Sequence, residues 1–299
     1  MTPTFSYEAA FSRNIGWVTP DEQSTLRGKR VAIAGVGGNG GAYLLTLARL
    51  GVGSFTIADF DRFDVPNFNR QMGAMNSTLG QPKVEVMARL ARDINPALDI
   101  RVFDGGVDKS NVGDFLADVD CYVDGLDFFA FDARETVFPE CARRNIPAVT
   151  ALPLGMGASV MSFLPSGMSF EDYFKWAGET DDEKGLKLLM GMAPAGLHGT
   201  YLMHPEAVDF YAHRVPSIIM GCSLCAGIVS TEALKLMLGR GTVRSAPHGL
   251  HFDAYRAKFR KTWRPGGNAN PLQRLALAVV RRRLEKMRRD REAAAPATK

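Results

Sequence analysis

The sequence predicts an α/β protein of the Rossmann-like type, with a mainly parallel sheet flanked by helices and a small C-terminal substrate-binding portion. Two observations support this prediction. Short apolar runs alternate with segments of helical periodicity along most of the chain, as expected when helices join the strands of a parallel sheet. The stretch from Arg30 to Asp61 also has the pattern strand, glycine loop, helix and strand within 32 residues, which is typical of a nucleotide-binding βαβ unit.

The glycine loop of this unit has the residues that a phosphate site requires. An apolar run at 31–34 leads into Gly35-Val36-Gly37-Gly38-Asn39-Gly40-Gly41, and apolar residues at helical spacing follow from 42 to 50. Glycine lets the chain turn tightly and bring backbone N–H groups close to an anion at the positive end of a helix. We therefore predict that the nucleotide is bound by Gly35, Gly37, Gly38 and Gly40.

Two acidic residues follow the second strand of the unit, which is predicted at 54–58. Asp59 stands 24 positions after Gly35, and Asp61 comes two residues later. An acid about 20 residues after the loop can accept hydrogen bonds from the ribose hydroxyls of a nucleotide. Both acids are therefore predicted to belong to the nucleotide site. The unit taken alone favours NAD or FAD.

The residues after Asp61 favour a polyphosphate ligand instead. Three amides and one guanidinium occur within five residues, Asn67-Phe68-Asn69-Arg70-Gln71. A lysine then begins a predicted helix at the end of Gly80-Gln81-Pro82-Lys83. Arginine offers a planar fork of donors. The helix dipole disfavours a lysine in the first turn, and a bound anion would explain its presence. We predict phosphate contacts from Asn67, Arg70, Gln71 and Lys83; a solvated lysine at a helix end is the alternative for Lys83.

The alternation continues with strands predicted at 100–103, 121–123 and 148–151, and with helices after Asn111 and from about 133 to 145. Asp124 and Asp127 follow the strand 121–123, at the edge where open α/β sheets bind ligands. A carboxylate that faces phosphates there suits Mg²⁺, which prefers oxygen ligands.

The chain is predicted to divide into five parts. They are an N-terminal helical segment (1–29), a nucleotide-binding core (30–165), a crossover or substrate region (166–216), the remainder of the core (217–265) and a basic helical tail (266–299). In the crossover, Ser169 and Asp172 form a capping box that opens a short helix, and a stretch rich in Gly and Met follows. We expect a mobile crossover over the substrate groove; an ordinary insertion that packs on the sheet is the alternative.

The charge of the chain is concentrated in its tail. The formal net charge is +4, yet from Arg274 to Lys299 nine Lys or Arg oppose three acids, a balance of +6 that leaves the other 273 residues at −2. Apolar residues recur there at helical spacing, which predicts a basic amphipathic helix. Such a helix can contact RNA, anionic lipid or an acidic protein, or can pack by one stripe with its cations solvated. No aromatic residue interleaves the cations, which argues against nucleic acid.

The composition narrows the class of protein. With 46% apolar and 23% charged residues, the chain is typical of soluble globular proteins. We identify no secretion signal in its first ten residues and no apolar run long enough to span a bilayer. Four cysteines indicate a reducing cytoplasm. Cys222 and Cys225 form a single Cys-x-x-Cys pair, which cannot fill four tetrahedral positions, so no zinc site is expected.

Taken together, these motifs resemble those of the ThiF/MoeB/HesA family of ubiquitin-activating-enzyme-like adenylyltransferases. The resemblance covers about 11–239, and its motifs occur in the family's order. They are Ser12-Arg13-Asn14-Ile15-Gly16, the glycine loop, Asp59-Phe60-Asp61, Asn67 to Gln71, Gly80 to Lys83, Asp124 with Asp127, and Thr231-Glu232-Ala233-Leu234-Lys235.

The resemblance implies a role for each matching residue. The glycine loop and Asp59 would hold ATP, Arg70 and Lys83 would contact its phosphates, and Asp127 would support Mg²⁺. Arg13 would reach into the partner subunit's site of a homodimer. The implied reaction is attack of a carboxylate, the C-terminus of a ubiquitin-like protein or a peptide, on the α-phosphate of ATP, which gives an acyl adenylate and pyrophosphate.

The chain departs from the family's pattern after Asp127. Phe128 stands where the family commonly has Asn, and Arg134 lies seven residues beyond Asp127 where the family has an Arg at five. Two other classes of protein stay open. An NAD- or FAD-dependent oxidoreductase would use the glycine loop and Asp59 but leave Arg70 and Lys83 unexplained, and a non-catalytic scaffold would bind ATP without forming pyrophosphate.

Overall fold

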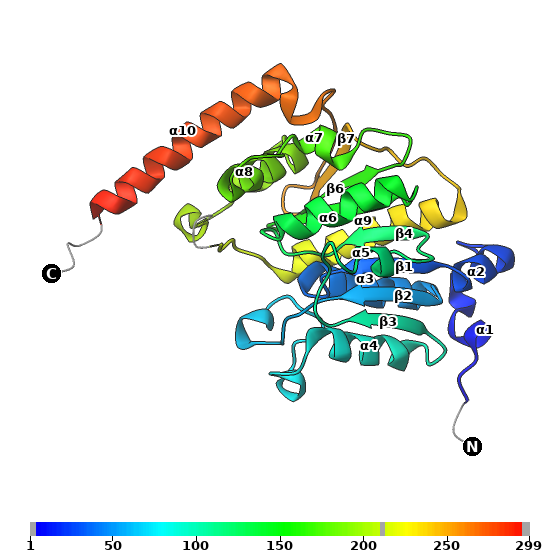
Figure 1. Cartoon of the computed structure of the whole chain (residues 1–299). Coiled ribbons are helices and arrows are strands. Elements are labelled where there is room, and N and C mark those ends of the chain that lie inside the picture. The colour runs from blue at the N-terminus through cyan, green and yellow to red at the C-terminus, as the bar shows by residue number, and fades with distance from the viewer. Residues whose placement is uncertain (1–3, 210–212, 295–299) are drawn as a thin grey trace.

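The computed structural model describes residues 4–209 and 213–294. Its centre is an eight-stranded sheet with the order β3-β2-β1-β4-β5-β6-β7-β8 (Figure 1). The strands are β1 Arg30–Ala34, β2 Ser54–Ala58, β3 Asp99–Phe103, β4 Cys121–Asp124, β5 Ala148–Leu154, β6 Gly157–Phe163, β7 His248–Asp253 and β8 Lys258–Trp263.

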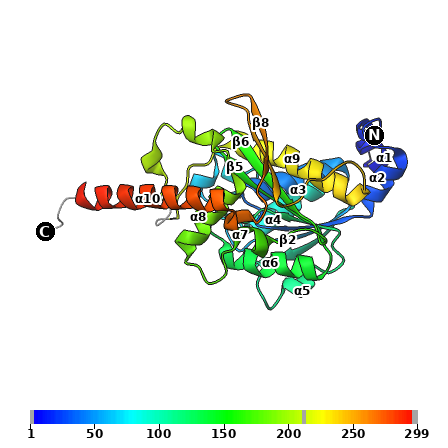
Figure 2. The same ribbon diagram turned by 90° about the horizontal axis from the view of Figure 1, so that it is seen from above.

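Helices cover both faces of this sheet (Figure 2). One core includes apolar residues of α2, α3, α4 and α9, and the other includes those of α5, α6, α7 and α8. The helices are α1 Tyr7–Ala10, α2 Pro20–Arg27, α3 Gly38–Leu50, α4 Lys83–Ile94, α5 Val112–Phe115, α6 Phe131–Arg143, α7 Phe170–Phe174, α8 Asp181–Met192, α9 Ile219–Leu238 and α10 Pro271–Ala294.

The first half of the sheet is parallel, as predicted. β1 pairs with β2 on one side and with β4 on the other, and β2–β3 and β4–β5 are also parallel. All five residues of β1 are buried, because helices cover both faces of a parallel sheet, and this is why its strands appear in the sequence as continuous apolar runs. The carboxyl ends of β1, β2 and β4 therefore lie side by side.

The second half of the sheet is antiparallel. β5 turns directly into β6, and β7 and β8 extend the sheet from there. β7 alternates between buried and half-buried positions. This half corresponds to the small C-terminal portion that the sequence predicts, and it confirms the fold class.

The first part of the crossover region packs on the sheet, as in the alternative to a mobile crossover. The capping-box helix is present as α7, with Ser169 Oγ accepting from the N–H of Asp172. The Gly- and Met-rich stretch forms α8, which Thr180 caps. Phe170 and Trp176 are buried with α8 against the sheet. The prediction of a mobile crossover is therefore wrong for 166–192, since apolar side chains anchor both helices. Residues 210–212 lie outside the described part of the chain.

α9 spans 20 residues and extends well beyond the motif Thr231 to Lys235 that the sequence analysis named. Among the described residues it is the helix that is long and apolar enough to cross a membrane by length and composition. The prediction that no apolar run reaches that length is wrong because the helix begins at Ile219. Cys225, Val229 and Ala233 on its inner side are fully buried in the core with α3 and α4, which is the environment of a core helix.

Candidate nucleotide-binding site

The glycine loop is built by close contact with the end of β4. Gly35 has a left-handed φ of +78°, and a Cβ at Gly40 would lie 1.7 Å from the carbonyl oxygen of Gly35. A Cβ at Gly125, just after β4, would lie 2.3 Å from that same oxygen. Gly35 and Gly40 are thus required for packing of the loop, which only glycine allows. Gly125 is a third member that the sequence analysis missed.

Gly37 and Gly38 instead face side chains of the loop between β2 and α4. A Cβ at Gly37 would meet the amide of Gln71 at 3.5 Å. At Gly38 it would lie 3.3 Å from Sγ of Cys222 and 3.5 Å from Cγ of Arg70. The structure therefore brings Gln71 and Arg70, two residues that the sequence predicts to contact phosphate, against the start of α3. Backbone N–H groups at a helix start form a natural cradle for phosphate.

Asp59 ties the glycine loop to the end of β2. Its Oδ2 accepts from the N–H of Val36 at 2.8 Å, and its Oδ1 accepts from the N–H of Asp61 at 2.9 Å. Burial raises the pKa of Asp59, and the two backbone donors act in the opposite direction. The carboxylate is thus held in place beside the loop, where a ribose would lie in a βαβ unit.

Lys83 is buried and paired, in contrast to the solvated lysine of the alternative. It is 6% exposed, and its Nζ lies 2.9 Å from Oδ2 of Asp61, whose side chain is 53% exposed. The N–H of Lys83 also donates to the carbonyl oxygen of Asp61 at 2.9 Å. The fold therefore places an ammonium group at the carboxyl edge of the sheet, beside the half-solvated carboxylate of Asp61.

Arg70 lies in the loop between β2 and α4, whose shape is stabilised by hydrogen bonds. Its Nη1 donates to the carbonyl oxygen of Pro66 at 3.0 Å and to Oδ1 of Asn69 at 2.9 Å. Nδ2 of Asn69 donates to the carbonyl oxygen of Ser217 at 2.8 Å, which joins this loop to the segment before α9. The Oδ1 of Asn67 accepts from the N–H of Asp64 at 3.0 Å, so that oxygen shapes the loop.

Two buried amide oxygens at the glycine loop have no hydrogen-bond partner among the described residues. They are Oε1 of Gln71 and Oδ1 of Asn39. Nδ2 of Asn39 donates to the carbonyl oxygen of Ala151, at 3.4 Å. Buried polar atoms are normally paired, and an unpaired one is a position that a ligand or a water molecule can complete. Asn39 is a candidate that the sequence analysis missed, although an amide within a run of glycines was a signal for it.

Asp124 and Asp127 have different environments. Asp124 is buried and accepts from Nε of Arg134 at 2.9 Å and from Oγ1 of Thr150 at 2.7 Å. The other guanidinium nitrogens of Arg134 donate to the carbonyl oxygens of Leu126, Asp127 and Phe128. Arg134 therefore holds the loop after β4, a structural role that its spacing did not reveal. Its ion pair also occupies the carboxylate of Asp124.

The carboxylate of Asp127 is exposed, and its Oδ1 accepts from the N–H of Phe129 at 3.0 Å. It stands two residues after Gly125, which packs against the glycine loop. Mg²⁺ at nucleotide sites commonly takes one or two carboxylates together with phosphates and water. Asp127 fits that ion as a single protein ligand. Within 4–209 and 213–294, no group of three or more His, Cys, Asp or Glu side chains is placed to hold a metal by itself.

The cysteines are buried thiols. Burial raises the pKa of Cys121 to about 12 and raises that of Cys222. A nucleophilic cysteine needs a lowered pKa and access to solvent, so neither is suited to form a thioester. Cys222 and Cys225 lie on the inner side of α9.

Arg13 lies away from this site within one chain. It is exposed in the 3-10 turn Ser12–Asn14, and Nδ2 of the adjacent Asn14 donates to the carbonyl oxygen of Leu50 at the end of α3. The glycine loop is at the other end of α3. A single chain therefore does not bring Arg13 to the nucleotide site.

This constellation defines a nucleotide-binding protein of the Rossmann-like class, in which cations and an acid surround a glycine loop. The sequence pattern of the ThiF family matches residues 11–274, and the chain belongs to that family. The prediction made from the motifs is confirmed.

Individual relatives agree with this membership. The chain is 32% identical over 146 residues to the tRNA threonylcarbamoyladenosine dehydratase of Haemophilus influenzae, covering 48% of this chain and 55% of the relative. It is 29% identical to the SAMP-activating enzyme E1 of Haloferax volcanii, covering 75% and 73%. The chain thus spans only about half the length of some of the relatives it matches. The crystal structure of E. coli MccB with ATP shares the fold, with a TM-score of 0.64 at 18% identity over 88% of this chain and 73% of MccB.

Proposed function

We propose that this protein is an ATP- and Mg²⁺-dependent adenylyltransferase that activates a polypeptide carboxylate, the C-terminus of a ubiquitin-like protein or a peptide. The observation that supports the proposal is the arrangement of Arg70 and Gln71 against the glycine loop, with an unpaired amide oxygen on Gln71, together with the buried Lys83 that pairs with Asp61. The similarity of the chain to a SAMP-activating enzyme and to MccB, whose crystal structure holds ATP, supports the proposal.

The chemistry asks for positive charge rather than for covalent catalysis. Negative charge grows on the α-phosphate and on the departing pyrophosphate when a carboxylate attacks. Arg70 and Lys83 would stabilise that charge, Lys83 by exchanging the half-solvated Asp61 for a phosphate. Mg²⁺, when bound, adds positive charge at the phosphates, and Asp127 would hold it. Gln71 and Asn67 would add neutral contacts, and Asp59 would accept from the ribose.

Homodimerisation is part of the proposal, since Arg13 can serve a site only in another copy. Ile15 and Trp17 follow it in the sequence and are 44% and 86% exposed. Large apolar side chains exposed together mark interaction surfaces. Arg240 holds this segment through the carbonyl oxygen of Trp17 at 2.7 Å. A second copy would cover the patch and bring Arg13 to its nucleotide site. The cytoplasm is the proposed location, since four unpaired thiols suit a reducing compartment.

Exchange of labelled pyrophosphate into ATP tests the reaction. A pool of peptides with free C-termini should support exchange in the wild type, whereas the same pool amidated at the C-terminus should not. Lys83→Ala should lower the exchange rate about 10²- to 10³-fold, because it removes a charge that stabilises the transition state. The exposed Lys109→Ala is the matched control. Exchange that is equal for free and amidated peptides would refute carboxylate activation.

A further inference from the structure

The C-terminal helix α10 is a part of the chain that the proposed adenylation site does not use. The family match ends at residue 274, within the first four residues of α10. Gln273 anchors the helix to α8 through the carbonyl oxygen of Met190 at 2.7 Å, and Leu277 is buried. Beyond this anchor the helix projects from the body, on the side where the β2–α4 loop of the nucleotide site lies (Figures 1 and 2).

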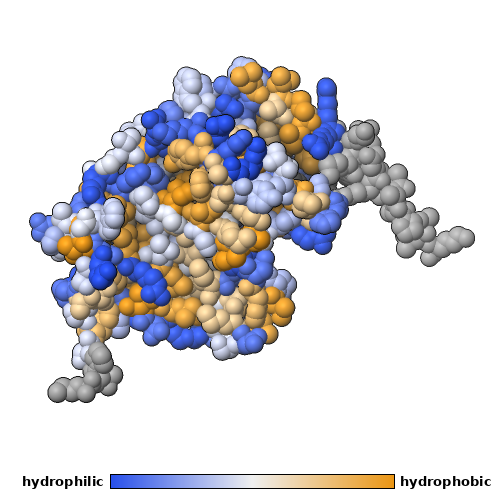
Figure 3. All heavy atoms as spheres, turned by 180° about the vertical axis from the view of Figure 1, so that it is seen from behind, coloured by the Kyte–Doolittle hydropathy of each residue, from blue (hydrophilic) through white to orange (hydrophobic). Residues whose placement is uncertain are grey.

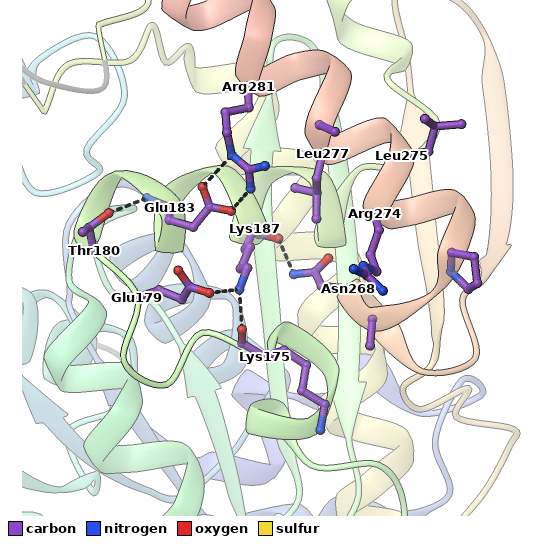
Figure 4. Close-up of a pocket in the computed structure, with 13 residues that line it drawn as sticks. Lys175, Glu179, Thr180, Glu183, Lys187, Asn268, Arg274, Leu275, Leu277 and Arg281 are labelled. Atoms are coloured by element: carbon purple, nitrogen blue, oxygen red, sulfur yellow. Dashed lines mark hydrogen bonds and ion pairs between the residues drawn. The ribbon is translucent and has the colours of Figure 1, made fainter.

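A groove lies between α10, α8 and the turn Gly267–Ala269 (Figure 4). Its volume is about 960 Å³, near the upper end of the range of ligand pockets, roughly 300–1,000 Å³. Two acids face it, and each already has a cation: Glu179 lies 2.7 Å from Nζ of Lys187, and Oε2 of Glu183 lies 3.1 Å from Nε of Arg281. The negative charges of the groove are therefore neutralised from within.

The remaining cations determine what the groove attracts. Arg274 lines the groove, and Arg282 and Arg283 follow on the exposed surface of α10. None of the three pairs with an acid in the part of the chain that the structure describes. The sequence from 274 onwards adds a balance of +6 against −2 for the rest of the chain. The ligand that this surface favours is anionic.

An apolar stripe runs beside these cations. Leu272, Leu275 and Val279 are 71%, 64% and 58% exposed, and their spacing places them along one side of the helix. Figure 3 shows apolar residues gathered over the start of α10. Leu275 also lines the groove. The surface therefore offers apolar contact and positive charge together, which an acidic segment with apolar side chains can satisfy.

We infer that the α8–α10 groove and the adjoining stripe bind an acidic polypeptide segment with apolar side chains, and so dock the polypeptide whose carboxylate is activated. This inference rests on the proposed function. A lipid bilayer fits less well, because it presents a broad flat surface whereas the groove between α8 and α10 is concave. RNA fits less well, because no aromatic platform lines the groove.

Fluorescence anisotropy on the full-length protein tests the inference. The probe is a fluorescein-labelled amphipathic peptide of Glu and Leu, about 20 residues long so that it forms a helix face. We expect the wild type to bind it, and the triple variant Arg274→Glu/Arg282→Glu/Arg283→Glu to bind it about tenfold more weakly or worse. The matched control reverses three exposed cations elsewhere, Arg49→Glu/Lys109→Glu/Arg260→Glu, and should bind as the wild type does.

The apolar contribution is measured separately. Leu275→Ser/Val279→Ser leaves the charge unchanged and should weaken peptide binding about fivefold, since it removes apolar contact area. Circular dichroism on every variant verifies that the fold is kept.

Three outcomes would overturn the inference. The first is that the acidic peptide does not bind the wild type while a Lys-and-Leu peptide does. The second is that the triple variant and the control variant bind the acidic peptide equally well. The third is that the triple variant loses binding only to phosphatidylglycerol vesicles or to an oligouridine RNA. ATP affinity is measured on the same proteins by calorimetry. Failure of ATP to bind the wild type would refute the proposed function, whereas failure of the peptide alone would refute only the docking site.

Discussion

Gln71 is a residue that the fold buries without pairing its amide oxygen. It is 8% exposed and lies against Gly37. A buried side chain that serves stability normally has its hydrogen bonds completed within the protein. Its position at the glycine loop agrees with a role that begins only when a ligand arrives.

Substituting Gln71 by Leu separates the two roles. The free energy of unfolding of the variant should lie within about 1 kcal/mol of that of the wild type. The substitution replaces an amide whose oxygen is unpaired by an apolar side chain of similar size. ATP affinity should fall about tenfold, because the variant lacks the amide oxygen that would accept a hydrogen bond from a hydroxyl or amino group of the nucleotide. Thermal unfolding and calorimetry measure the two effects. A large loss of stability with unchanged ATP affinity would show that Gln71 is structural.

His251 gives the fold a pH dependence. It is 1% exposed on β7, and neither ring nitrogen has a partner among the described residues. Burial lowers its pKa to about 4, with His198 acting in the same direction and Asp253 in the opposite one. His251 therefore binds a proton near its ordinary pKa of 6.5 in the unfolded chain, but only near a pKa of about 4 in the folded chain. The contribution of neutral His251 to stability is fully present above pH 6.5 and is lost as the pH falls towards 4.

The expected loss between these limits is roughly 3 kcal/mol at most, from 1.36 kcal/mol per pH unit. Denaturant unfolding at pH 7 and at pH 4.5 measures it. His251→Leu should show a smaller difference between the two pH values than the wild type does. An equal difference in both proteins would assign the pH dependence to other groups.

The site residues that the sequence predicted are those whose positions can be deduced from local spacing along the chain. The glycine loop, Asp59 and Lys83 each follow a strand or begin a helix, so their position relative to the sheet could be deduced. Asn39 had a local signal, an amide within a run of glycines, that was not used. Arg134 and Gly125 could not be found in this way. Their roles come from contacts between segments far apart in the chain, such as the pairing of Arg134 with Asp124.

At the scale of the element, the glycine loop depends on the contact between α3 and the start of the loop. Gly40→Ala would place a methyl group 1.7 Å from the backbone oxygen of Gly35. Backbone must shift to relieve that overlap, so we expect a loss of about 3 kcal/mol or more in the free energy of unfolding, together with loss of ATP binding.

Gly227→Ala in α9 is the matched control. No atom lies within 4 Å of a Cβ there, and alanine is favoured over glycine in a helix, so a gain of about 0.5–1 kcal/mol is expected. Urea unfolding of both variants measures the contrast. Equal stability of the two would contradict the close packing of the glycine loop.

β5 extends beyond its predicted end at 151 to Leu154, and α6 begins two residues before its predicted start. The other ends of the parallel strands were predicted to within one residue, because buried strands are continuous apolar runs. α8 was not, since glycines and an acidic start obscure its periodicity. Packing against the sheet, through residues such as Leu188, stabilises it as a helix together with the Thr180 cap. The start of α9 at Ile219 was not predicted either. Gly221 fits there because a Cβ would lie 2.6 Å from the carbonyl oxygen of Gly155, a contact that no local pattern predicts.

At the scale of the whole molecule, a site completed by a second copy predicts complementation. Arg13→Ala and Lys83→Ala should each be inactive in pyrophosphate exchange. After the two variants are mixed and their subunits reassort, activity should return to about one quarter of the wild-type value, since half of the dimers then hold one intact site. Arg13→Ala mixed with itself is the control. Full activity of Arg13→Ala alone would refute a role for Arg13 in the partner's site.

The central claim is that the glycine loop, Arg70 and Lys83 bind the phosphates of ATP. Calorimetric titration of ATP with Mg²⁺, and separately of NAD, into the wild type, Arg70→Ala, Lys83→Ala and the control Lys109→Ala tests it most directly. We predict that ATP binds the wild type and the control, that both site variants weaken it about tenfold or more, and that NAD gives no signal. Binding of NAD that neither site substitution changes would contradict the claim and favour an oxidoreductase.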